Sequence, residues 1–156
     1  MAVNGTNANA SAGHKLGQLV GDWFEEHFVL PLLTDVADGL HLYLDHRFRA
    51  RPARGEKILW NDEEDNSVDY DFVMELDGSD EAIGVPVAFF ECFWRRGSRH
   101  SKDKARDDSG KLAPMSFVHP TARFLGIVAA GDFTQPARQL VLSRGIDLFY
   151  IPKGPC

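Results

Sequence analysis

Residues 89–96 read FFECFWRR, and this stretch places a single glutamate, Glu91, inside a run that otherwise suits a protein interior. The residues from Val85 to Trp94 are mostly apolar, which predicts a strand buried on both faces of a sheet. An ionised carboxylate in such a strand is costly unless it is paired, bound to a metal or neutralised. Glu91 is therefore the first candidate for a functional residue.

The composition predicts one globular domain with an uneven surface charge. The chain has 156 residues, of which 44% are hydrophobic and 26% are charged. The formal net charge of −6 gives no sign of a nucleic-acid-binding surface, but residues 62–81 hold ten acids and no Lys or Arg. Basic residues gather in two clusters: Arg95, Arg96, Arg99, Lys102, Lys104 and Arg106, and then Arg47, Arg49, Arg51, Arg54 and Lys57. Local charge is therefore more informative than net charge.

The cysteines and the apolar runs bear on localisation. Cys92 and Cys156 are too few for a disulfide framework or a zinc site, which predicts a protein of the reducing cytoplasm. No apolar run approaches the roughly 18 residues of a membrane span, and no signal-peptide pattern opens the chain. We expect no membrane association.

The periodicity of apolar residues predicts a mixed sheet flanked by helices. Residues 1–13 are small and polar and predict a disordered leader, followed by a single domain over 14–156. Helices are predicted at 14–30, ending near Pro31, and at 135–144, closed by Gly145; strands are predicted within 39–48, 67–76, 85–94, 122–131 and 146–151. Residues 97–121 lack periodicity and predict a loop with at most one short helix. The order α-β-β-β-loop-β-α-β is typical of an α/β or α+β fold.

The predicted strands bring carboxylates together. Residues two apart on a strand share a face, so Asp69 and Asp71 point the same way. If strands 67–76 and 85–94 are neighbours, Asp71 and Glu91 converge near their ends. Mg²⁺ is a common partner of two such carboxylates. The alternative is that Asp69 and Asp71 lie on a solvated edge while Glu91 pairs with an arginine.

The helix, the strand carrying VDYDFV (68–73), the loop and VAFFECFWR (87–95) together resemble the PD-(D/E)xK nuclease superfamily. Its members include restriction endonucleases, Mrr-like enzymes and Holliday-junction resolvases, and the resemblance covers residues 14–152. It implies a restriction-endonuclease-like core and an Mg²⁺- or Mn²⁺-dependent DNA endonuclease. By this resemblance Asp71, Glu91 and the backbone carbonyl of Cys92 hold the metal. The family's helix often adds a glutamate, for which Glu26 fits the helical pattern better than Glu25.

One position departs from the family pattern. Where the family has its catalytic lysine, this sequence has Phe93, which offers neither a donor nor a charge. A basic residue from elsewhere could take the role, and the candidates are Arg95, Lys102, Lys104 and Lys111. The fold could instead persist as an inactive DNA-binding relative, or the lysine could have been altered in this chain. ECKWRR would be ordinary for the family, which favours a lost or substituted lysine over a relocated one.

The resemblance implies DNA as the partner, bound mainly through its phosphates. The residues expected to contact DNA are Arg95, Arg96, Arg99, Lys102, Lys104, Arg106, Arg49 and Arg51, and a homodimer would allow both strands to be cut. Trp94 could stack on a base or simply pack in the core. Three interpretations stay open: a metal-dependent endonuclease, an inactive nucleic-acid-binding module, and a protein whose acidic and basic blocks pair with each other. RNA is not excluded as the polymer.

Overall fold

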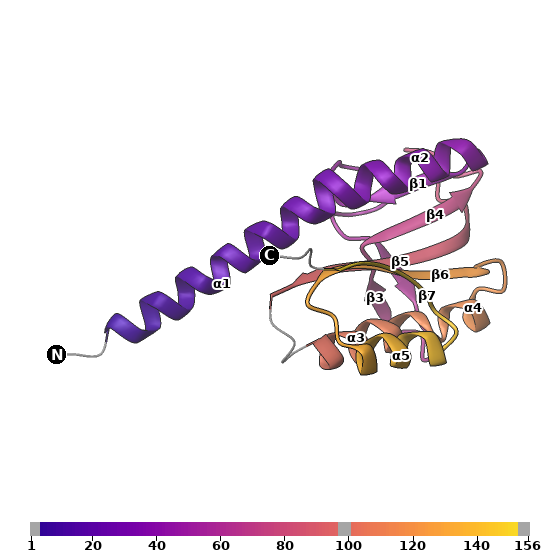
Figure 1. The fold of residues 1–156 in the computed structure, drawn as a ribbon. Helices are drawn as coiled ribbons and strands as arrows, with labels where there is room; N and C mark the ends of the chain where they lie inside the picture. The colour runs from indigo at the N-terminus through magenta and orange to yellow at the C-terminus, as the bar shows by residue number, and fades with distance from the viewer. Residues whose placement is uncertain (1–3, 97–100, 153–156) are drawn as a thin grey trace.

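The computed structural model describes residues 4–96 and 101–152, and it consists of one sheet between two helical layers (Figure 1). The sheet has five strands in the order β1-β4-β5-β6-β7. Their bounds are Tyr43–His46 (β1), Phe72–Leu76 (β4), Val85–Arg95 (β5), Phe124–Gly131 (β6) and Asp147–Pro152 (β7). Strands β1, β4 and β5 are antiparallel, whereas β5, β6 and β7 are parallel. The predicted mixed sheet flanked by helices is confirmed, and β5 is its central strand.

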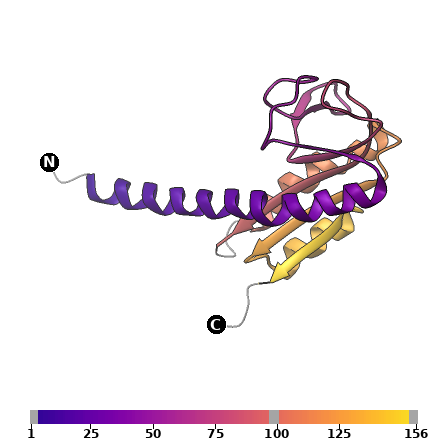
Figure 2. The ribbon, with the colours of Figure 1, turned by 90° about the horizontal axis from the view of Figure 1, so that it is seen from above.

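The first helical layer is longer than the sequence predicts. Helix α1 (Asn4–Phe24) continues through a π-helical turn, η1 (Glu25–Val29), into α2 (Leu30–Leu40). Residues 4–13 therefore belong to a helix where a leader was predicted. Pro31 does not end the helix either, because it lies in the first turn of α2, and the π-helical turn just before it changes the hydrogen-bond pattern. Figure 2 shows the N-terminal part of α1 projecting beyond the sheet.

The second helical layer includes the segment predicted to be a loop. Within residues 101–121 the chain forms α3 (Ser101–Leu112) and α4 (Met115–Val118), and α5 (Gln135–Ser143) lies beside α3. The prediction was wrong here because α3 buries small and polar residues, which give little apolar periodicity. Gly145 has φ of +73° directly after α5, as predicted for the end of that helix.

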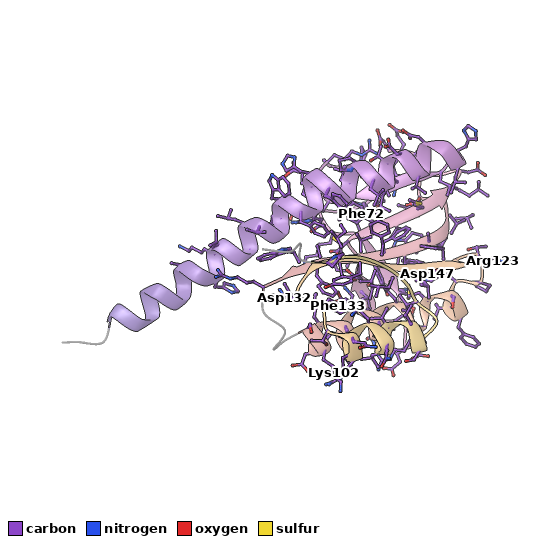
Figure 3. All side chains as sticks on the ribbon, viewed as in Figure 1. Phe72, Lys102, Arg123, Asp132, Phe133 and Asp147 are labelled. Atoms are coloured by element: carbon purple, nitrogen blue, oxygen red, sulfur yellow. The ribbon has the colours of Figure 1, made fainter. Side chains whose placement is uncertain are left out.

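Each face of the sheet packs against one helical layer. The face with Phe89, Phe93 and Ile127 packs with residues of α3 and α5. The opposite face, with Phe72, Phe90 and Cys92, packs with residues of η1 and α2. Phe72 lies on the α1–α2 side of the sheet in Figure 3. A separate hairpin, β2 (Leu59–Asn61) and β3 (Ser67–Asp69), adds Trp60 and Val68 to the first of these cores. None of the helices described is both long enough and apolar enough to cross a membrane.

Candidate metal centre

Asp71 lies at a break in the segment that the sequence predicts as one strand. The Tyr70 amide donates to the Ile58 carbonyl at 2.9 Å, so the chain leaves the β2–β3 hairpin and enters β4 just after Asp71. Phe72 pairs with Phe90 on the neighbouring strand, which brings Asp71 beside Glu91. The predicted convergence of these two carboxylates is therefore observed. Asp69 remains exposed in the hairpin and does not join them.

Asp71 is also held against the backbone of β5. The Cys92 amide donates to Asp71 Oδ2 at 2.9 Å. The N–H and C=O groups of one strand residue point toward the same neighbouring strand, so the Cys92 carbonyl also faces the edge where Asp71 lies. This is the carbonyl that the resemblance implies as a metal ligand.

Cys92 and Glu91 lie on opposite faces of β5. Asp71 lies at the strand edge, close to side chains on both faces. On the α1–η1 side, ligand atoms of Glu25, Asp71 and Cys92 all lie within 4.8 Å of one another, so these side chains could hold a metal ion. Burial raises the pKa of Glu25, and the Asp71 charge adds to this effect. Arg47 opposes it: its Nε and Nη2 donate to the two Glu25 carboxylate oxygens, each at 3.0 Å.

The thiol of Cys92 is buried and sits among these acids. Burial raises its pKa well above the ordinary value, and the charges of Asp71 and Glu25 raise it further. The thiol therefore remains protonated at neutral pH unless a cation displaces the proton. Its sulfur adds a soft ligand to a site otherwise made of carboxylate oxygens.

On the α3 side, the Glu91 carboxylate meets a lysine. Lys111 Nζ contacts Glu91 Oε1, while Glu91 itself is only 2% exposed. Burial raises the Glu91 pKa well above its ordinary value; Asp71 raises it further, through a hydrogen bond and its charge, and Lys111 opposes the rise. Asp108 on α3 adds another negative charge nearby. The cluster thus brings four acids, Glu25, Asp71, Glu91 and Asp108, close together in a largely buried region.

Two contacts place Lys111. The Tyr70 hydroxyl donates to the Lys111 backbone carbonyl at 3.0 Å, and Lys111 Nζ lies 5.2 Å from the centre of the Tyr70 ring. The lysine side chain is 34% exposed, so it joins the buried Glu91 to the protein surface. Lys111 was one of four basic residues that the sequence left open for the family's lysine role.

The helix glutamate that lies with Asp71 and Cys92 is Glu25 and not Glu26. The Glu26 side chain is 50% exposed, and its nearest charged partner is His27, at 3.8 Å. The prediction was wrong because it took the most apolar stripe of the helix as the buried one. Leu19 and Trp23 of that stripe are 66% and 61% exposed, since α1 extends past the sheet. The buried face instead runs along i, i+4 positions: Glu25, Val29, Leu33 and Ala37.

The position of the missing lysine is part of the core. Phe93 is 6% exposed and packs edge-on against Phe133, with ring centres 5.1 Å apart. Of the two lysines predicted as catalytic, Lys102 is exposed, and its label lies on the outer side of α3 in Figure 3. Lys104 Nζ is bound to Asp108 Oδ1 at 3.0 Å. Neither contacts Glu91 as Lys111 does.

The arginines predicted to contact DNA fall into two groups. Arg51 is 2% exposed and binds Glu75 and Asp45 in the interior, so it cannot reach DNA. Arg49 pairs with Asp80, 3.4 Å away, and lies over the Tyr43 ring, beside the end of β4 farther from Asp71. The second basic cluster is thus largely engaged with carboxylates, because Arg47 and Arg54 are also paired.

The described arginines of the first basic cluster are more exposed to solvent. Arg95, Arg96 and Arg106 are exposed at the end of β5 and on α3. Arg106 pairs with Asp103, 3.5 Å away. Arg99 lies outside the described residues.

Comparison of the chain with protein-family models, curated proteins and solved structures found no match. The site is therefore interpreted from its own geometry. The sequence pointed to Asp71 and Glu91, ranked Glu25 below Glu26, and gave no sign of Arg47 or Asp108 at this site. Glu25 could have been found from its i, i+4 spacing to the core residues of α2, whereas Arg47 and Asp108 carry no local signal.

Proposed function

We propose that this protein is a metal-dependent endonuclease with a restriction-endonuclease-like core, in which Mg²⁺ or Mn²⁺ binds at Asp71. The observation that carries the proposal is the meeting of Asp71 and Glu91 from adjacent antiparallel strands, with Lys111 against Glu91. The strand order β1-β4-β5-β6, with helices on both faces, supports the same interpretation. The resemblance of the Asp71 and Glu91 motifs to PD-(D/E)xK nucleases supplies the reaction class.

Each residue has a defined part in the proposed reaction. Asp71 and the Cys92 carbonyl would hold the cation, with Glu91 beside them and Glu25 joining from the other side of the strand edge. The metal would lower the pKa of a bound water and neutralise charge on the phosphate during phosphodiester hydrolysis. Lys111 would take the part of the family's lysine, since its ammonium group can hold a water or a phosphate oxygen beside Glu91.

Cleavage of supercoiled plasmid with Mg²⁺ or Mn²⁺ tests the proposal. We expect the protein to nick or linearise plasmid in the presence of either metal, and Asp71→Asn to abolish cleavage. Lys111→Met should reduce cleavage about 10²- to 10³-fold, while Lys102→Met on the same helix should cut normally. Absence of metal-dependent cleavage of plasmid, of single-stranded DNA and of RNA would contradict the proposal.

A non-catalytic nucleic-acid-binding module is the second candidate, and the burial of Phe93 favours it. Because Phe93 packs in the core, no donor extends from that strand position toward the site. In that case the protein would bind DNA or RNA with a strong salt dependence and leave it intact. Binding without cleavage, unaffected by Lys111→Met, would identify this candidate. The homodimer and the cytoplasmic location predicted from the sequence stay predictions.

A further inference from the structure

A groove runs between α1 and the end of β5 and ends at the candidate metal centre. Its volume is about 860 Å³, and Glu25 and Cys92 line it. These are two of the three side chains that could hold a metal ion. The groove is thus the opening through which a ligand can approach Asp71 from the α1 side.

Three glycines lie along the α1 wall of the groove, between side chains that include His14 and Gln18. Gly13, Gly17 and Gly21 recur at every fourth position, which places them on one face of the helix, and all three line the groove. A Cβ atom built on any of them would meet nothing within 4 Å. Close packing inside the protein therefore does not require these glycines, and their effect is to leave the groove open.

The opposite wall carries an aromatic ring and positive charge. Trp94, Arg95 and Arg96 line it at the end of β5, and Lys104 joins them from α3. Trp94 is half-buried and lines the groove. The ion pairs formed among the described residues include neither Arg95 nor Arg96. Aromatic rings that accept stacked bases, beside cations that accept phosphates, are the means by which proteins bind single nucleic-acid strands.

We propose that this groove binds one single polynucleotide strand and guides it to the metal centre. The inference rests on the proposed function, since it names the substrate of the same site. A groove of this volume suits a ligand of drug-like size, such as a short stretch of one strand. Phosphates would lie along Arg95 and Arg96, and bases would lie against Trp94 and the glycine face of α1.

Fluorescence anisotropy with labelled oligonucleotides tests the inference, with Ca²⁺ in place of Mg²⁺ to prevent cleavage. The probes are a single-stranded DNA, a single-stranded RNA of the same sequence and the corresponding DNA duplex. We expect at least about tenfold tighter binding of one or both single strands than of the duplex, and the two single-stranded probes identify the preferred sugar. Equal or tighter binding of the duplex would overturn the inference.

Two pairs of variants locate the binding surface. Gly17→Leu fills the groove and should weaken single-strand binding about tenfold or more, whereas Gly39→Leu, on an open face of α2, should bind normally. Arg95→Ala with Arg96→Ala should weaken binding and reduce the slope of log K against log salt by about 1.4, the value for two lost phosphate contacts. Arg123→Ala with Lys57→Ala removes the same charge elsewhere on the protein and should leave the affinity and the salt slope unchanged. Arg123 lies at the other end of β6 from Asp132 in Figure 3.

The outcome separates this inference from the proposed function. If metal-dependent cleavage persists and Gly17→Leu cuts and binds as well as Gly39→Leu, the groove is not the strand site although the nuclease assignment stands. If no nucleic acid is cut but single strands bind with the expected losses in Gly17→Leu and the arginine variant, the groove assignment stands without the nuclease.

Discussion

Two buried glutamates on neighbouring strands, Glu75 on β4 and Glu91 on β5, have opposite surroundings. Glu75 is fully buried, and Arg51 donates to both of its oxygens, at 2.6 and 2.9 Å. The Gly84 amide adds a third hydrogen bond at 2.6 Å. Glu91 is almost as buried, but a single lysine contacts it while Asp71 and Asp108 crowd it with like charge.

The comparison separates a carboxylate whose charge is fully matched from one whose charge is not. The charge of Glu75 is matched by a planar guanidinium and by backbone groups, so nothing further needs to bind there. The charge around Glu91 is short of positive partners, which a divalent cation would supply. Burial of a glutamate is therefore a weak indication of function by itself, and the balance of nearby charge is the stronger one.

The largest expected effect comes from removing the cation of each glutamate. Arg51→Met should lower the free energy of unfolding by about 3–5 kcal/mol, because it leaves Glu75 and Asp45 buried without their partner. Lys111→Met should cost less than about 1 kcal/mol, since Glu91 can retain a proton when its raised pKa is no longer opposed. Urea unfolding of the metal-free variants measures both. Equal losses would remove the distinction between the two sites.

The second largest effect is on the rate of DNA cleavage, and it tests whether Lys111 beside Glu91 takes part in the reaction. Lys111→Met should reduce plasmid cleavage about 10²- to 10³-fold, the usual loss when one group that stabilises transition-state charge is removed. Lys102→Met is the matched control, because Lys102 is exposed on the same helix. Single-turnover rates at saturating Mg²⁺ give the comparison. Full activity in Lys111→Met would exclude Lys111 from the lysine role.

A metal should stabilise one site and not the other. At a hundred times its dissociation constant, Mg²⁺ should raise the free energy of unfolding by about 2.7 kcal/mol. Asp71→Asn should abolish this gain, while Asp80→Asn, near the Glu75 end of the sheet, should retain it. Thermal unfolding with and without Mg²⁺ measures the difference. A gain that survives Asp71→Asn would place the cation elsewhere.

The smallest effect is a pH dependence set by Glu91. Its folded-state pKa is raised above the ordinary 4.5, so the folded protein holds this proton over a pH range in which the unfolded chain has lost it. The stability that Glu91 contributes is therefore complete below about pH 4.5 and is lost as the pH rises through the folded-state pKa, with a slope of at most about 1.4 kcal/mol per pH unit. Unfolding of wild type and Glu91→Gln in EDTA, from about pH 5 to pH 8, isolates the contribution of Glu91 to the free energy of unfolding. A stability difference that grows in favour of wild type with rising pH would show that Lys111 dominates.

The sequence was sufficient to predict the main sheet and to identify Asp71 and Glu91 as candidates for the site. Strands β5 and β6 stand out because both of their faces are apolar, and Glu91 stands out against that background. Asp71 followed from strand alternation and from the resemblance, although a break at Tyr70 separates it from β3. These features depend on residues close together in the chain, which is why a local pattern reveals them.

The rest of the site depends on packing that no local pattern encodes. Arg51 sits in a basic run that predicted DNA contact, yet it reaches Glu75, 24 residues away. Glu75 itself lies in an acidic stretch of the sequence, residues 62–81, yet its side chain is fully buried. Lys111 reaches Glu91 because α3 forms where a loop was predicted. Such long-range pairing is visible only once the elements are assembled.

Crystals grown with Mn²⁺ test most directly whether the acids around Asp71 form a metal centre. We expect an anomalous difference peak within coordination distance of an Asp71 carboxylate oxygen, beside the Cys92 carbonyl, that disappears in Asp71→Asn. Crystals of wild-type protein in millimolar Mn²⁺ with no peak at Asp71, or with the same peak in Asp71→Asn, would contradict this expectation.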